Sequence, residues 1–221
     1  MNLPAEFLPH WLMLPAWLLF MAIWAWNLAG APWRLLTVNG LWPLFLSACL
    51  LLIGLWWMSV GAHVGLEFHL LGLTSMVLLF GWRLALAGGG LALFALAAAG
   101  AYDWTALGLN GLLGVVFPVL LAHRLHEWIY RWLPKHYFVY LMVAAHFSSM
   151  LVIAAVALSG GLVLLLTGAY GWGRVGGDFF LFLPLVMLPE GFLNGALLTT
   201  LTLLKPEWVR SFDDRDYIDN K

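Results

Sequence analysis

The chain has 221 residues, of which 63% are apolar and only 10% are charged. A soluble domain carries roughly 25% charged residues, and water does not solvate a surface as apolar as this composition requires. The composition therefore excludes a water-soluble globular protein and predicts an integral membrane protein. The net charge of −1 offers no basic face for binding nucleic acid.

A helix that crosses a bilayer needs about 20 mostly apolar residues. We predict an all-α integral membrane protein, a single bundle of seven transmembrane helices over residues 11–30, 41–61, 68–82, 83–101, 106–128, 138–160 and 179–204. The third stretch is short and runs into the fourth, with Trp82 and Arg83 marking the reversal.

The basic residues predict the orientation of these helices. Cytoplasmic loops of membrane proteins carry an excess of Lys and Arg. With the N-terminus outside and the C-terminus inside, nine of the ten basic residues fall on the inner side, namely Arg34, Arg83, Arg124, Arg131, Lys135, Lys205, Arg210, Arg215 and Lys221. Only Arg174 falls outside. Six helices, made by fusing the third and fourth, would bring Arg83 into the middle of the membrane, so we reject that alternative.

We expect one transmembrane domain over residues 1–204, followed by a charged cytoplasmic tail over 205–221. The tail is most simply a solvated end, and a docking segment for a partner is the alternative. No Lys or Arg precedes the first apolar run, which argues against a cleaved signal peptide. Met1 is therefore expected to be the mature terminus, on the outer side or tucked into the bundle.

Polar side chains gather on the predicted outer side, namely Glu6, His10, His63, Glu67 and His69. His63 and Glu67 are four residues apart, so a helix would put both on one face. Imidazole and carboxylate groups suit divalent transition metals. We therefore hypothesise a metal site among these residues. The alternative for each histidine is an interfacial side chain hydrogen-bonded to water or backbone.

Two ionisable residues lie deep in the predicted bilayer. Glu190 is about halfway along the last helix, and His146 is roughly 12 Å from the inner end of the sixth. Such groups are costly in lipid and usually face the bundle interior with a partner. Their similar depth predicts a contact or a shared water between the two. Alternatively, Glu190 is protonated or bonds backbone freed by Pro184 and Pro189.

The motifs of several enzyme classes are absent from the sequence. His126 and Glu127 begin like a zinc-protease motif, but Tyr130 stands where the second His is needed. Neither Gly-x-Ser-x-Gly nor a phosphate-binding loop occurs. We expect no enzymatic activity, and any ATP-driven process requires another chain. His123 and His126 are predicted to be surface residues near the inner interface.

Four segments are similar, in order along the chain, to segments of a known family. They are Met1–Leu8 (MNLPAEFL), His69–Leu71 together with Leu78–Trp82, Gly108–Asn110, and Glu190–Gly195 (EGFLNG). They resemble the family's Met-His-Ile-Pro-Asp-Gly-Phe-Leu terminus, its His-Leu-Leu segment with a Leu-Leu-Gly turn, its Gly-Val-Asn, and its Glu-Ala-Leu-Ile-Thr-Gly. The family is CbiM/NikM, the membrane subunits that capture cobalt or nickel in energy-coupling-factor transporters.

The resemblance implies a seven-helix fold whose N-terminal segment inserts into the bundle. It also implies a metal held by the terminal amine, by the amide nitrogen and imidazole of the second residue, and by a later His. Carried over, these positions are Met1, Asn2 and His69. Asn2 has no imidazole, so one strong donor is missing. His63, Glu67, His10 or Glu6 would replace it.

The leading hypothesis is a substrate-capture component in the plasma (inner) membrane, with a transition metal ion as substrate rather than cofactor. The resemblance implies a separate coupling membrane subunit and ATPase subunits as partners. A different class of function is a membrane protein that binds haem through histidines such as His63, His69 or His146. A third is a non-metal membrane protein that keeps only the fold.

Overall fold

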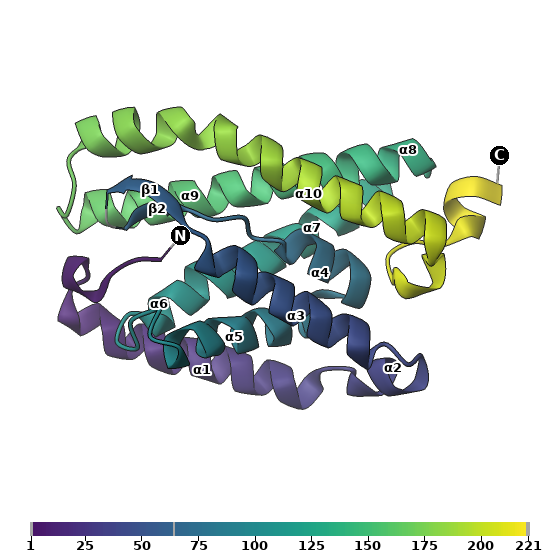
Figure 1. The fold of residues 1–221 in the computed structure, drawn as a ribbon, viewed down its shortest axis with the longest axis horizontal. Coiled ribbons are helices and arrows are strands. Elements are labelled where there is room, and N and C mark those ends of the chain that lie inside the picture. Colours follow the sequence, from purple (N-terminus) through teal and green to yellow (C-terminus); the bar gives the residue numbers. More distant parts are fainter. Residues whose placement is uncertain (1, 64, 220–221) are drawn as a thin grey trace.

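The computed structural model describes residues 2–63 and 65–219 as a bundle of helices with one short β-hairpin (Figure 1). In chain order the elements are α1 (His10–Gly30), α2 (Trp33–Val38), α3 (Trp42–Trp57), β1 (Val60–His63), β2 (Leu66–Phe68), α4 (Leu73–Phe80), α5 (Trp82–Ala98), α6 (Leu107–Gly111), α7 (Phe117–Trp132), α8 (Tyr137–Val139), α9 (Ser148–Leu166) and α10 (Leu183–Leu204). π-Helical turns over Leu112–Val116 and Tyr140–Phe147 join α6 to α7 and α8 to α9.

Four helices are long and apolar enough to cross a membrane, namely His10–Gly30, Leu107–Trp132, Tyr137–Leu166 and Gly173–Leu204. The last begins with a π-helical stretch, Gly173–Phe179, and ends in α10. α3 and α5 are apolar but have only 16 and 17 residues. At a rise of about 1.5 Å per residue they span roughly 25 Å, slightly less than the hydrocarbon core. The predicted class, a helical membrane protein, is confirmed.

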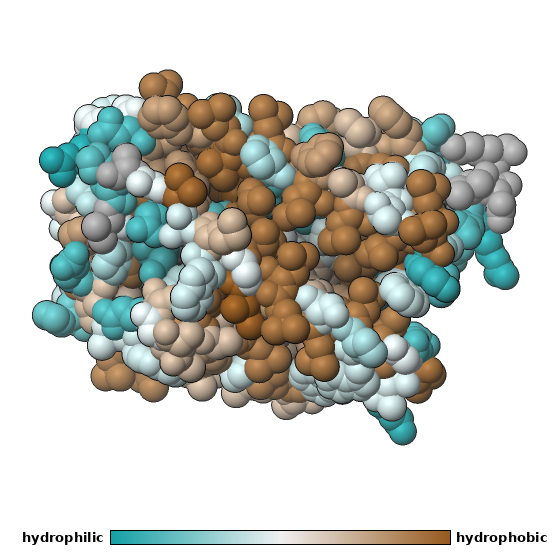
Figure 2. All heavy atoms as spheres, viewed as in Figure 1, coloured by the Kyte–Doolittle hydropathy of each residue, from teal (hydrophilic) through white to brown (hydrophobic). Residues whose placement is uncertain are grey.

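The outer surface of the bundle is what a bilayer requires. Figure 2 shows apolar side chains over the middle of the molecule and hydrophilic ones gathered toward its two ends. Large apolar residues are exposed on the long helices, among them Leu14 and Leu18 of α1, Leu158 of α9, and Leu185 and Phe192 of α10. In water such a belt would be an aggregation site, and in lipid it is solvated.

The prediction of a helix over residues 68–82 is wrong at residues 68–72. α4 has eight residues, and the chain before it forms the antiparallel hairpin of β1 and β2. Gly65, in the hairpin turn, and Gly72, before α4, both have positive φ, of 77° and 66°. Such backbone conformations suit glycine and interrupt a helix. His63 and Glu67 therefore lie on paired strands and not on one helical face.

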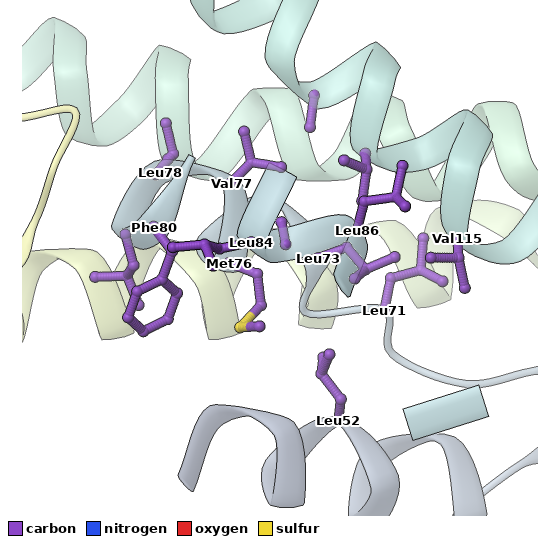
Figure 3. Close-up of a cluster of buried hydrophobic side chains, with 14 of the residues drawn as sticks. Leu52, Leu71, Leu73, Met76, Val77, Leu78, Phe80, Leu84, Leu86 and Val115 are labelled. Atoms are coloured by element: carbon purple, nitrogen blue, oxygen red, sulfur yellow. The ribbon is translucent and has the colours of Figure 1, made fainter. Parts of the chain in front are cut away.

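α4 is the centre of the hydrophobic core. All eight of its residues are buried, and Figure 3 shows Leu73 and Met76 among side chains of the neighbouring helices, such as Leu52 of α3. Close packing depends on two glycines of α5. A Cβ at Gly88 would stand 2.6 Å from Met76 Cε, and one at Gly89 would stand 2.8 Å from Val115 Cγ1. Residues 69–72, the non-helical backbone directly before α4, are also largely buried, so protein shields them from lipid.

The tail after α10 is packed against the bundle, so the simple expectation of a solvated end is wrong. The N–H groups of Arg210 and Ser211 donate to the carbonyls of Leu79 and Leu78, each over 3.1 Å. Phe212 and Tyr217 are buried and pack against Tyr140. These aromatic residues bury enough apolar surface to hold the tail in place.

Candidate metal centre

The N-terminal segment packs into one end of the bundle, where Asn110 of α6 holds it. The Leu3 N–H donates to Asn110 Oδ1 over 2.9 Å, and Asn110 Nδ2 donates to the Leu3 carbonyl and to Asn2 Oδ1, each over 3.0 Å. The Leu3 side chain is 1% exposed. The Asn110 amide thus pairs with the chain as a neighbouring strand would. Met1, a predicted ligand, lies outside the described residues.

His69 follows β2 and is buried at the same end of the molecule. Its ring lies beside the Trp56 ring, with centroids 5.8 Å apart, and Nδ1 is 3.3 Å from the Leu70 carbonyl oxygen. The indole N–H of Trp56 in turn donates to the Leu71 carbonyl over 3.0 Å. Trp56 therefore supports both the ring of His69 and the backbone that follows it.

Glu190 of α10 anchors the backbone directly after His69. Its carboxylate oxygens accept the N–H groups of Leu71, over 2.7 Å, and Gly72, over 2.9 Å. Asn194, four residues along the same helix face, donates to Glu190 Oε1 over 2.8 Å. Asn194 Oδ1 accepts both the N–H and the hydroxyl of Ser75, over 2.9 and 2.7 Å. Buried polar groups are thereby satisfied, and α10 determines where the segment between His69 and α4 runs.

The hydrogen bonds of Glu190 within the described chain do not include the predicted partner His146. The His146 ring packs instead against two glycines of α10. A Cβ at Gly191 would stand 3.1 Å from its Nε2, and one at Gly195 would stand 3.2 Å from its Nδ1. The two helices meet as the sequence predicts, but the carboxylate turns toward the 71–72 backbone.

The remaining predicted ligands are spread over the surface of this end. His63 Nε2 lies 3.2 Å from Asp178 Oδ2, and Glu67 Oε2 accepts the Ser59 hydroxyl over 2.9 Å. Glu6 and His10 are exposed at the start of the chain. Over residues 2–63 and 65–219, no three His, Cys, Asp or Glu residues are grouped as a metal site would require.

The N-terminal segment and the His69 loop, which is residues 69–72 between β2 and α4, flank one residue of α9. Val156 lines a small cavity with Leu3 and Asn110, and a second small cavity with Glu67 and His69. The side chains of Leu3 and Leu66 also belong to one apolar cluster. The start of the chain and the buried imidazole are thus neighbours, held by Asn110 from one side and by Glu190 from the other.

Two residues with clear roles in this arrangement received none in the sequence analysis. Asn194 is one turn after Glu190, a spacing that places both on one helix face and could have suggested joint action. Asp178 meets His63 across 115 positions of sequence. No local pattern indicates such a pair, because the contact depends on how the hairpin folds over the start of the last long helix.

The apolar helices and the exposed apolar belt define a multi-pass helical membrane protein. Its sequence matches the model of the family described as the cobalt uptake substrate-specific transmembrane region over residues 2–208. The chain belongs to this family, and it is thereby a membrane component of metal uptake. The resemblance inferred from four short segments is confirmed.

Two crystal structures share the fold. One is described as a truncated transition metal transporter, with a TM-score of 0.77, 16% identity, and coverage of 92% of this chain and 99% of that one. The other is described as a transition metal transporter, with a TM-score of 0.76, 16% identity, and coverage of 92% and 93%. A search of curated proteins finds no match to this sequence.

Proposed function

We propose that this protein captures a divalent transition metal ion of the cobalt or nickel type at the end of the bundle that holds His69. The observation that carries the proposal is the convergence of the N-terminal segment and the His69 loop on Val156. A chain terminus supplies an amine, and a neighbouring imidazole supplies the second nitrogen donor that such metals prefer.

In this proposal His69 and the amine of Met1 are the first two ligands. Asn2 contributes no imidazole, and its side-chain oxygen already accepts a hydrogen bond from Asn110. His63, Glu67, His10 and Glu6 remain candidates for completing the coordination. Of these, His63 and Glu67 would have to leave their present partners Asp178 and Ser59.

We further propose that seven crossings place the N-terminus and the hairpin outside the cell and residues 205–221 in the cytoplasm. One transmembrane domain over 1–204 precedes that tail. The distribution of the basic residues supports this orientation. The third crossing is completed by the extended residues 69–72 that lead into α4, because α4 alone is too short.

Release of the metal into the cell would require other subunits of an energy-coupling-factor transporter in the plasma membrane. The sequence contains no phosphate-binding loop, so ATP hydrolysis would come from separate ATPases acting through a coupling membrane subunit. The haem hypothesis gains no support, because His63, His69 and His146 lie beside Asp178, Trp56 and Gly191, in three separate surroundings.

Calorimetric titration with Ni²⁺ and Co²⁺ tests the proposed site, using protein with a free N-terminus and a C-terminal tag. Asn2→His should raise the affinity at least about tenfold, because an imidazole is added beside the terminal amine. Adding His69→Ala to that variant should remove the gain, and His136→Ala, at the opposite end of the bundle, is the matched control. Equal affinity of the wild type and of both Asn2→His proteins would show that this terminus is not a metal site.

A further inference from the structure

A cavity of about 460 Å³ opens at the end of the bundle opposite the N-terminal segment. It lies between the end of α1, the turn from α4 to α5, α7 and the tail. The residues around it that carry polar groups are Trp82, Arg83, His123, His126, Arg210 and Ser211. His123 and His126 therefore border a hollow and are not simple surface residues.

Two guanidinium groups, of Arg83 and Arg210, line the cavity. The Arg83 guanidinium lies against the Trp26 and Trp82 rings, 4.8 and 4.9 Å from their centroids. Arg210 Nη1 donates to the Phe80 carbonyl over 3.2 Å. The ion pairs found among residues 2–63 and 65–219 include neither guanidinium. Each guanidinium has five N–H donors, so most remain available to a ligand.

The two histidines add further capacity for hydrogen bonding. His123 Nε2 is 3.5 Å from Glu127 Oε1, and Arg124 Nη1 donates to the same carboxylate over 3.2 Å. The Glu127 carboxylate therefore already has two partners. His126 Nδ1 is buried and has no hydrogen-bond partner in the described chain. A buried polar atom without a partner is costly, and the residue that carries this one lines the cavity.

We propose that this cavity binds the phosphate group of an anionic phospholipid. The planar guanidinium fork matches phosphate oxygens, and basic pockets between helices at a membrane interface bind anionic headgroups. Trp26, which contacts Arg83, is 61% exposed on the apolar face of α1 and marks the rim of the cavity as lipid-facing. Free phosphate offers the same chemistry, but it lacks acyl chains to lie against that face. The site is independent of the proposed metal centre.

Thermal unfolding of the full chain in neutral detergent tests the proposal. Phosphatidylglycerol should raise the melting midpoint by roughly 5 °C over the same amount of phosphatidylcholine. The variant Arg83→Gln/Arg210→Gln should lose this rise. Arg131→Gln, which removes an exposed charge at the same end but away from the cavity, should keep it. Equal responses of the double variant and the wild type would overturn the proposal.

Two further ligands, inorganic phosphate and a polyglutamate peptide, distinguish the compounds that this cavity could bind. A rise with inorganic phosphate as well as phosphatidylglycerol would support the shared phosphate chemistry, and a rise with the lipid alone would support the headgroup specifically. A rise only with a polyglutamate peptide would overturn the proposal in favour of an acidic protein segment.

If the double variant is unstable, native mass spectrometry of the proteins should show phosphatidylglycerol retained by wild type and Arg131→Gln, and lost by His126→Ala.

Discussion

At the scale of single residues, the geometry of the candidate site depends on side chains that bond backbone. Glu190 and Asn110 come from distant helices, and each satisfies main-chain groups of a segment that has no regular structure. A non-helical segment inside a membrane bundle exposes N–H and C=O groups that lipid cannot satisfy. These two side chains supply the missing partners, and they thereby determine where His69 and Leu3 lie.

Glu190→Ala should lower the stability of the protein and weaken metal binding together. It leaves the N–H groups of Leu71 and Gly72 without acceptors, at about 1–3 kcal/mol for each buried group. Glu190→Gln keeps one acceptor oxygen and should lose less. Thermal unfolding and calorimetric titration of both variants check this, with the exposed Glu207→Ala as control. An unchanged midpoint for Glu190→Ala would contradict the anchoring role.

The residue types at the site could be predicted from the sequence, but their partners could not. A carboxylate at the depth of Glu190 indicates an interior role because an unpaired charge is too costly there. Depth alone favoured His146 as its partner. The actual partners are the backbone N–H groups of Leu71 and Gly72, which point at Glu190 where the chain turns at positive φ before α4. The depth of a residue in the membrane does not predict this backbone geometry.

At the scale of elements, long apolar runs predicted the helices well, because only helices satisfy their own backbone in lipid. The failures at residues 58–61 and 68–72, which were assigned to helices, have a physical origin. Gly61, Gly65 and Gly72 weaken a helix, and the extended residues 69–72 are tolerated because most of them are buried in protein. Hydropathy measures preference for a nonpolar environment and does not distinguish lipid from a protein core.

Glycine also sets how closely α1 and α6 approach. A Cβ at Gly108 would meet the backbone of Trp17 and would stand 2.8 Å from the Ala16 carbonyl carbon, so Gly108→Ala must push the helices apart. We expect a loss of about 1–3 kcal/mol in the free energy of unfolding, with weaker metal binding because Asn110 moves with α6. Gly114→Ala, where nothing lies within 4 Å, is the matched control in thermal unfolding. Equal effects of the two substitutions would argue against this close contact.

At the scale of the whole molecule, the proposed orientation can be tested by cysteine accessibility. In a Cys49→Ala background, Arg174→Cys should react with a membrane-impermeant thiol reagent in intact cells. Arg215→Cys should react only after lysis, because the tail lies at the end that carries nearly all the basic residues. Labelling of position 215 in intact cells would refute the orientation.

The docked tail should respond to acid. A hydrogen bond from the Tyr130 hydroxyl, with the Lys135 ammonium nearby, holds the pKa of Asp216 below its ordinary value. A depressed pKa in the folded state adds stability above the ordinary pKa of about 3.9, and this contribution disappears as pH falls through the folded value.

Melting midpoints of wild type and Asp216→Asn should therefore differ at neutral pH and converge below about pH 3.9. Asp214→Asn removes an exposed carboxylate of the same tail and should match the wild type at every pH. A difference between wild type and Asp216→Asn that persists unchanged into acid would contradict the role of this carboxylate.

α4 is bonded at both ends to a single continuous stretch of chain. Glu190 and Asn194 bind its start, and Arg210 and Ser211, shortly after α10, bind its last carbonyls. The loop that holds His69 and the tail at the far end of the bundle are therefore parts of one cooperative unit. In native-state hydrogen exchange, the amides of Leu71, Ser75 and Ser211 should open with the same free energy, although they lie at opposite ends of α4.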